Sequence, residues 1–124
     1  LHIWKKRGIQ KTCAHMAHRE GMRVAHVCAW KTSALAYDGS GKVERDPDNY
    51  SLCTFRNGKR YNCDLSASYN IGARYFIREL TKPMPVTAWS VLEAEVPAVR
   101  RRSSCVYADL VKLSAVMRGN GLTA

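Results

Sequence analysis

The first regular pattern of apolar and polar positions lies near the start of the chain. Residues 9–20 place Ile9, Cys13 and Met16 on one helical face, and Gly21 follows where a helix commonly ends. The spacing predicts an amphipathic helix that stops at this glycine.

The pattern then changes to one typical of β-structure. Residues 22–30 carry apolar side chains at positions that suit a largely buried strand. Turn signals follow at residues 38–41, at 46–49 and at Asn57-Gly58, the last being the strongest two-residue hairpin signal. We predict a small β-subdomain over residues 32–62, inserted between a strand and a helix.

A two-residue turn at Asn57-Gly58 fixes the pairing of the strands beside it. It places Arg56 opposite Lys59 and puts Cys53 and Cys63 on opposite faces of the sheet. The like-charge pair costs stability unless an anion lies between the two cations or both side chains extend into solvent. Neither alternative is favoured by the hairpin alone.

The clearest helical pattern covers residues 64–80. Asp64 begins it in a position typical of an N-cap. The expected apolar stripe comprises Leu65, Tyr69, Gly72, Phe76 and Leu80. This spacing predicts a helix that buries these five residues.

The last part of the chain combines a connector with a final helix. Residues 81–102 hold three of the four prolines and end in Arg100-Arg101-Arg102. Ser103 or Ser104 is a candidate cap for a helix that ends at Gly119. Its apolar stripe comprises Val106, Leu110, Leu113 and Met117. The order of helix, strand, β-insert and helix predicts an α/β fold.

Charge gives the first indication of function. The 124 residues include 20 lysines and arginines against 10 acidic residues, a formal net charge of +10, with an apolar fraction of 46%. This composition is typical of one globular domain with a polyanionic partner, nucleic acid before a membrane surface. A soluble basic protein without such a partner is the alternative. No apolar run approaches the roughly 20 residues of a membrane span, so we expect no membrane-spanning segment.

The cysteines and histidines indicate neither disulfides nor a metal. Five cysteines, an odd number without a CxxC pair, are typical of reduced thiols in a cytosolic protein. His15 and His18 lie one helical turn apart near Cys13, too few ligands for a defined metal site. The chain starts at Leu1 rather than Met, so we expect the C-terminal part of something longer, or a processed chain.

Several motifs, taken in order, resemble a known family. Thr32-Ser33 precedes the β-insert, and Asp64-Leu-Ser-Ala-Ser-Tyr-Asn-Ile71 follows it. Over residues 9–80 this arrangement resembles the C-terminal end of TnpB-type proteins, the OrfB nucleases of insertion sequences, which are related to compact type V CRISPR effectors. Their helix motif has the form Asp-x-Asn-Ala-Ala-x-Asn-Ile, so Ser66 and Ser68 here replace the usual Asn and Ala.

The insert departs from the zinc ribbon of that family. The resemblance places the four ligand positions at Ala36, Gly39, Cys53 and Arg56, of which only Cys53 retains a ligand. One ligand is too few for a closed tetrahedral site. The resemblance therefore implies a degenerate ribbon without zinc. We expect an apolar cluster in its place, supplied by Tyr37, Tyr50, Phe55 and Tyr61.

Asp64 has two interpretations. As a helix-heading residue it is most often an N-cap, contributing on the order of 1 kcal/mol. The resemblance instead implies the last catalytic carboxylate of a RuvC-like nuclease, a ligand of Mg²⁺ in a two-metal site. The family's other carboxylates lie upstream, and no stretch before Arg23 resembles their strands. We expect the isolated chain to be catalytically inert.

The resemblance implies an α/β fold with a partial RNase-H/RuvC-like core, a zinc-ribbon-like β-insert and a C-terminal helix. Residues 1–31 would supply a helix and a core strand, and 32–63 the degenerate ribbon. Residues 64–80 would carry the Asp64 helix, and 81–124 a basic connector and the final helix.

The function that this resemblance implies is the DNA-binding and partial catalytic segment of a transposon-associated, RNA-guided DNA endonuclease in the prokaryotic cytoplasm. Its partners would be DNA and a guide RNA, with Mg²⁺ in the complete protein. The residues expected to contact phosphates are Arg56, Lys59, Arg60, Arg100, Arg101 and Arg102. Two alternatives stay open: a non-catalytic basic nucleic-acid-binding module with a ribbon-like fold, and an interaction module that docks its tail helix on another protein.

Overall fold

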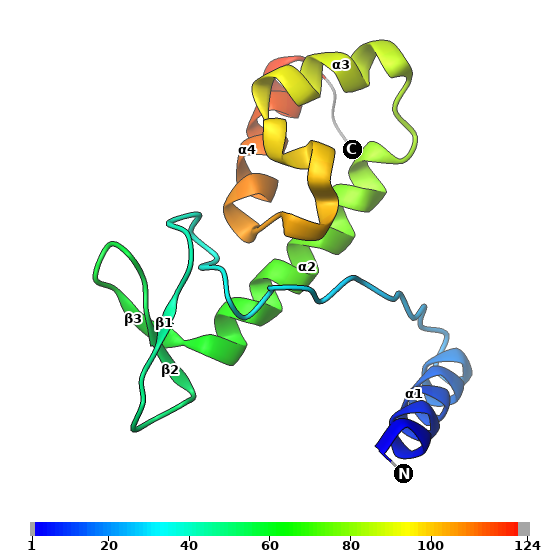
Figure 1. Ribbon diagram of the computed structural model, residues 1–124. Helices are drawn as coiled ribbons and strands as arrows, with labels where there is room; N and C mark the ends of the chain where they lie inside the picture. Colours follow the sequence, from blue (N-terminus) through cyan, green and yellow to red (C-terminus); the bar gives the residue numbers. More distant parts are fainter. Residues whose placement is uncertain (1, 122–124) are drawn as a thin grey trace.

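The chain is mainly helical, with one small antiparallel sheet (Figure 1). The computed structural model describes residues 2–121, with side chains from residue 8 onward. Along the chain the elements are α1 (His2–Arg19), β1 (Glu44–Arg45), β2 (Leu52–Thr54), β3 (Arg60–Asn62), α2 (Cys63–Thr81), α3 (Val86–Glu95), the 3₁₀ segment η1 (Pro97–Ser104) and α4 (Tyr107–Gly119). No helix within the described range is long and apolar enough to cross a membrane.

Helix α1 confirms the first predicted helix and extends it toward the N-terminus. Gly21 has a φ of 72°, and the backbone N–H groups of Gly21 and Met22 donate to the carbonyls of His18 and Ala17. This is a Schellman motif, which a glycine in the left-handed region permits. The predicted apolar face of α1 is not buried, because Ile9 and Met16 are exposed and α1 extends away from the rest of the chain (Figure 1).

The predicted strand over residues 22–30 is wrong. This stretch is irregular, exposed and close to extended, and it crosses α2 (Figure 1). Its carbonyl groups bond to arginine side chains instead of a neighbouring strand: Arg78 donates to His26, and Arg74 donates to Cys28 and Trp30. The apolar residues of this stretch favour burial, but no strand among the described residues pairs with its backbone, so its carbonyl groups bond to side chains.

The β-insert is confirmed, but its predicted register is wrong by one residue. The sheet order is β1-β2-β3, and Thr54 lies opposite Arg60. The turn contains three residues, because the Phe55 N–H donates to the Lys59 carbonyl and Gly58 takes the left-handed conformation with φ 89°. Arg56 therefore lies within the turn and does not face Lys59.

The shifted register also corrects the placement of two cysteines. Cys53 and Cys63 are both fully buried and share one small cluster with Ala36 and Phe55. Cys63 is the first residue of α2 rather than a continuation of β3. The two thiols thus lie on the same side, and burial together with the neighbouring Cys63 raises the pKa of Cys53 to about 11.

Aromatic rings complete this cluster, largely as predicted. The Tyr37 ring centroid lies 5.8 Å from that of Phe55, 5.0 Å from Tyr61 and 5.2 Å from Tyr69. Tyr50 is the exception, because it is 71% exposed and stacks under Arg45 instead. An apolar and aromatic cluster therefore holds the sheet against the start of α2.

Helix α2 confirms the second predicted helix, but of the predicted stripe only Leu80 packs against a core, and most of the stripe is not buried. Leu65, Tyr69 and Phe76 are 45%, 40% and 54% exposed. The buried side chains of α2 are instead Cys63, Ser66, Asn70, Ala73, Arg74, Ile77 and Thr81. Four of these side chains, Ser66, Asn70, Arg74 and Thr81, are polar or charged. Burial of this face is possible because its polar groups find hydrogen-bond partners, which an apolar pattern cannot reveal.

The N-cap of α2 is also different from the prediction. The Asn62 side chain accepts a hydrogen bond from the Leu65 N–H at 2.9 Å, so Asn62 is the cap. Asp64 lies in the first turn, two residues further on, with its side chain exposed.

Residues 81–102 form more than a connector, which corrects that prediction. They include α3 and most of η1, which is broken by a non-helical backbone at Arg101. The second core joins the end of α2 to these elements and to α4. Its buried residues are Ile77, Leu92, Val96, Val99, Cys105, Leu113 and Met117.

The stripe predicted for the last helix is confirmed at Leu113 and Met117, with Leu110 packed beside them. Neither Ser103 nor Ser104 caps the helix. The N-cap is Val106, whose N–H donates to the Asp109 carboxylate at 2.9 Å. An acid in the first turn takes the capping role that a serine was expected to fill.

Candidate nucleic-acid interface

A row of polar side chains along α2 determines how the parts of the molecule meet. Ser66, Asn70 and Arg74 are spaced four residues apart and therefore lie on one helical face. The Ser66 hydroxyl accepts from the Tyr37 N–H at 3.2 Å. Asn70 donates to the carbonyls of Thr32 and Leu35.

The same row reaches the C-terminal elements. The Asn70 side-chain oxygen accepts from the Tyr107 N–H at 3.0 Å, and Arg74 Nε donates to the Cys105 carbonyl at 2.9 Å. Burial lowers the pKa of Arg74. Side chains on the buried face of α2 thus form hydrogen bonds to backbone groups of the β-insert, the extended chain and the start of α4.

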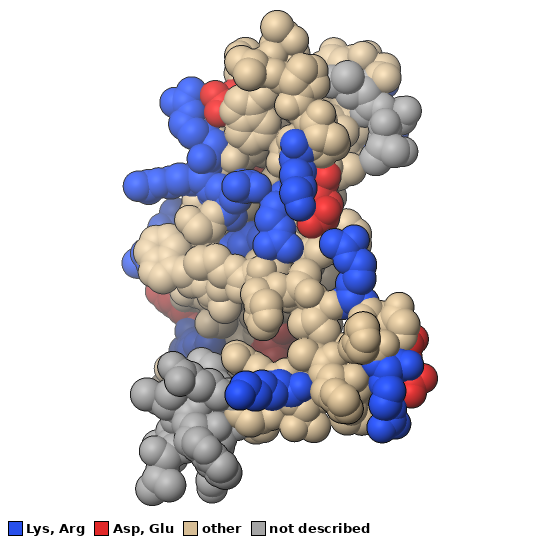
Figure 2. Space-filling view, turned by 90° about the vertical axis from the view of Figure 1, so that its right-hand side faces the viewer, with Lys and Arg blue, Asp and Glu red and all other residues tan. Residues whose placement is uncertain are grey.

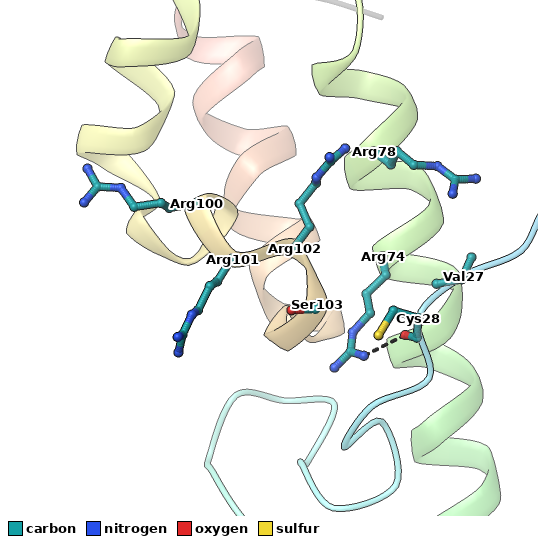
Figure 3. Close-up of a pocket in the computed structure, with 8 residues that line it drawn as sticks. All are labelled: Val27, Cys28, Arg74, Arg78, Arg100, Arg101, Arg102 and Ser103. Atoms are coloured by element: carbon teal, nitrogen blue, oxygen red, sulfur yellow. Dashed lines mark hydrogen bonds between the residues drawn. The ribbon is translucent and has the colours of Figure 1, made fainter.

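Five arginines border one pocket beside this row (Figure 3). The pocket has a volume of about 400 Å³. Its lining residues are Val27, Cys28, Arg74, Arg78, Arg100, Arg101, Arg102 and Ser103. The extended chain, α2 and η1, which are distant in sequence, all contribute to it.

The structure separates the six predicted phosphate contacts into two places. Arg56, Lys59 and Arg60 belong to the β-hairpin, whereas Arg100, Arg101 and Arg102 belong to η1 on the helical side. Figure 1 shows the hairpin at the beginning of α2, whereas η1 lies further along the helix, beside Arg74 and Arg78. The two groups do not form one compact patch.

The hairpin cations differ in what holds them. Lys59 Nζ donates to the Tyr37 hydroxyl at 2.6 Å and lies over the Tyr37 and Tyr61 rings. Arg60 pairs with Asp46 at 2.6 Å. The backbone N–H groups of Asp48 and Asn49, followed by Arg60, hold the pKa of Asp46 below its usual value. Among the described residues no carboxylate pairs with Arg56.

The three arginines of η1 are more available to an outside ligand than Lys59 and Arg60 of the hairpin. Arg100 pairs with Glu93 at 3.3 Å, and its side chain remains 76% exposed. Arg101 and Arg102 are exposed, and no described carboxylate pairs with either. Figure 2 shows that basic side chains cover more of one face than acidic ones do.

Sequence reasoning missed Arg74 and Arg78. They lie one helical turn apart on a helix that the sequence does predict. Their spacing of four was the available signal. It could not reveal that Arg74 is buried, because burial depends on carbonyl groups that lie about 30 or more residues away in sequence.

Asp64 does not form a metal site with its surroundings. No group of three or more His, Cys, Asp or Glu residues that could hold a metal occurs in the described part of the chain. A single carboxylate does not hold two Mg²⁺ ions, so the residues present do not fit a complete nuclease centre.

The expected zinc positions are likewise without a ligand group over the described residues. Ala36 and Cys53 are buried in the aromatic cluster, whereas Arg56 is exposed. Gly39 lies against Ala108, where an added Cβ would approach that side chain to 3.2 Å. Ala36, Gly39 and Cys53 thus pack against other side chains of the protein, whereas Arg56 extends into solvent.

Comparison with protein-family models, with curated proteins and with solved structures finds no match to this chain.

Proposed function

We propose that this chain is a nucleic-acid-binding segment that contacts phosphate groups rather than base edges. The observation that carries the proposal is a formal charge of +10 combined with arginines that no described carboxylate pairs with, at the hairpin tip and in η1. Such cations release counterions when they bind phosphates, a term that carries no sequence preference.

The test is the salt dependence of binding to duplex DNA and to single-stranded RNA. We expect log K to fall linearly with log salt. Replacing Arg56, Arg101 and Arg102 together with alanine should reduce the slope for duplex DNA by about 0.9 for each lost phosphate contact. The matched control replaces Arg19, Arg23 and Arg118, which removes the same charge from exposed positions outside the hairpin and the pocket.

A wild-type protein that does not bind either nucleic acid at low salt would overturn the proposal. Equal slopes for the two triple variants would show that binding depends on net charge alone, and would remove the hairpin and η1 from the interface.

A second and finer proposal follows the resemblance to TnpB-type nucleases. In a complete protein, Asp64 would supply one carboxylate to a metal site whose other ligands come from outside the described residues, and a guide RNA would direct binding to DNA. The observation that favours this role is the capping of α2 by Asn62, which leaves the exposed Asp64 carboxylate without a capping role. The non-catalytic basic module is the competing proposal.

The two proposals differ in the effect of Asp64→Asn on a full-length protein that contains this segment. The nuclease proposal expects cleavage to fall by orders of magnitude while DNA binding persists. Asp48→Asn is the matched control, since it makes the same change at an exposed position in the 46–49 turn. Near-normal cleavage by Asp64→Asn would exclude the catalytic role. The 124-residue chain itself should not cleave DNA in either form.

A further inference from the structure

The pocket between α2 and η1 has an unusual combination of side chains. Two arginines come from α2 and three from η1, and Ser103 adds a hydroxyl group. Among its described lining residues there is no carboxylate. A concave site bordered by several guanidinium groups is suited to an anion with more than one charge.

Arg74 forms the inner part of this pocket. It is only 3% exposed, and Figure 3 places its guanidinium between Cys28 and η1. Its Nε and Nη1 donate to backbone carbonyls, but its Nη2 is buried without any hydrogen-bond partner. A buried donor left unpaired is destabilising, and more so when it is charged. No described carboxylate balances the charge of Arg74, so both deficits indicate a missing acceptor.

The outer arginines surround the pocket with further positive charge. Arg78 and Arg100 each have a glutamate nearby, Glu79 at 3.7 Å and Glu93 at 3.3 Å. Arg101 and Arg102 have none within the described residues. Five arginines against two glutamates leave three positive charges uncompensated around the pocket. In Figure 3 the long η1 side chains extend from the rim, from which rotation about their side-chain bonds can bring them over a ligand.

We propose that this pocket binds one phosphate group, with Arg74 beneath it and the η1 arginines above it. Arg74 can donate to the phosphate only from Nη2, because its Nε and Nη1 already bond to backbone carbonyls. The guanidinium fork of an η1 arginine matches two further oxygens of the phosphate, and the Ser103 hydroxyl can donate to another. The identification of that phosphate as part of a nucleic-acid strand rests on the function proposed above. The pocket then fixes one position of the nucleic-acid strand, whereas the exposed Arg56 of the hairpin attracts that strand without fixing its position.

Two cysteines provide a direct test. Cys28 lines the pocket and is exposed, while Cys13 is exposed on α1 outside it. A phosphate group in the pocket covers the Cys28 thiol and places negative charge beside it, so alkylation by iodoacetamide should slow at Cys28 and not at Cys13. Mass spectrometry of the labelled peptides measures both rates in one sample. We expect inorganic phosphate to slow Cys28 in a saturable way, and acetate at equal ionic strength to leave it unchanged.

Variants then locate the effect. Replacing Arg101 and Arg102 with alanine should raise the phosphate concentration for half-maximal protection by about tenfold, the loss of charge-assisted hydrogen bonds. The control pair Arg19→Ala and Arg118→Ala should leave it unchanged. Both pairs are exposed, so neither requires the fold to tolerate the loss of the buried Arg74. Equal protection in both variants would overturn the proposal.

Oligonucleotides identify the source of the phosphate. Two short single strands of one sequence are compared, one with a 5′-phosphate and one with a 5′-hydroxyl. Protection by both supports a phosphate of the strand backbone, and protection by the first alone supports a terminal phosphate. Oligonucleotide binding without any protection of Cys28 would overturn the pocket proposal and leave the proposed function intact. Protection by inorganic phosphate without oligonucleotide binding would support the pocket and overturn the function.

Discussion

At the scale of single residues, Asn70 makes more structural connections than its polarity suggests. It is fully buried and bonds to Thr32, Leu35 and Tyr107, residues that lie 35 to 38 positions away in sequence. Its amide supplies two donors and one acceptor to backbone groups, in one buried and two partly buried hydrogen bonds. The Asn of the motif that resembles the TnpB family therefore has a structural role in this chain.

Asn70→Ala should destabilise the protein by about 3 kcal/mol or more, because one buried and two partly buried hydrogen bonds to the backbone are lost and a cavity forms. Asn120→Ala is the matched control at an exposed position and should change stability by less than about 0.5 kcal/mol. Urea denaturation followed by circular dichroism measures both. A similar small loss for the two variants would contradict the central role of Asn70.

At the scale of elements, the sequence predicts helices better than it predicts their buried faces. The existence of α1, α2 and α4 and their C-terminal ends follow from spacing and end signals, whereas the starts of α1 and α4 do not; the β-insert follows from its turns. Which side of α2 is buried depends on Asn70 and Arg74 finding distant carbonyl groups, and local patterning contains no such information. Helix α3 is not predicted because Pro83, Pro85 and Pro97 flank it closely and indicate a connector, although the helix itself contains no proline.

The candidate site shows the same division. Charge and the run of arginines in η1 are visible in the sequence, so their role as phosphate contacts could be proposed from it. The pocket was not predictable, because it requires the extended chain to cross α2 beside η1. The sequence thus predicts which residue types form the interface, but not how these residues are arranged in space.

Two glycines in different elements allow a paired prediction. Gly58 has a φ of 89° in the hairpin turn, whereas Gly72 lies inside α2, and an added Cβ meets no atom within 4 Å at either position. Gly58→Ala should destabilise by about 1–2 kcal/mol through backbone strain alone. Gly72→Ala should stabilise by about 0.5–1 kcal/mol, the cost of glycine within a helix. Thermal unfolding measures both, and shifts of the same sign would be inconsistent with the described turn or helix.

At the scale of the whole molecule, α2 contributes described residues to both of two separate cores. The sheet and aromatic rings pack at its beginning, and α3, η1 and α4 pack around its end. The described side chains of α1, from residue 8 onward, contribute to neither core, and α1 is connected to them through exposed chain.

This arrangement predicts where a protease cuts first. Limited trypsin digestion should cleave after Arg19 or Arg23, because the backbone there is exposed and outside both cores. A fragment that begins at residue 20 or 24 and keeps both cores should then persist. Mass spectrometry over a time course identifies it. Earlier cleavage after Lys112, within α4, would show that the C-terminal core opens before the chain that leads to α1.

The hydrogen bonds at the two ends of the β-insert determine where extra residues can be inserted into this chain. Leu35 bonds to Asn70, Tyr37 bonds to Ser66, and residue 63 begins α2, so the insert leaves and rejoins the helix within its first two turns. A segment whose ends are held together in this way can be lengthened at its distal turns at little cost in chain entropy. The 46–49 and 56–58 turns are therefore the places where this chain can accept insertions, and where a foreign peptide can be displayed while α3, η1 and α4 keep their packing.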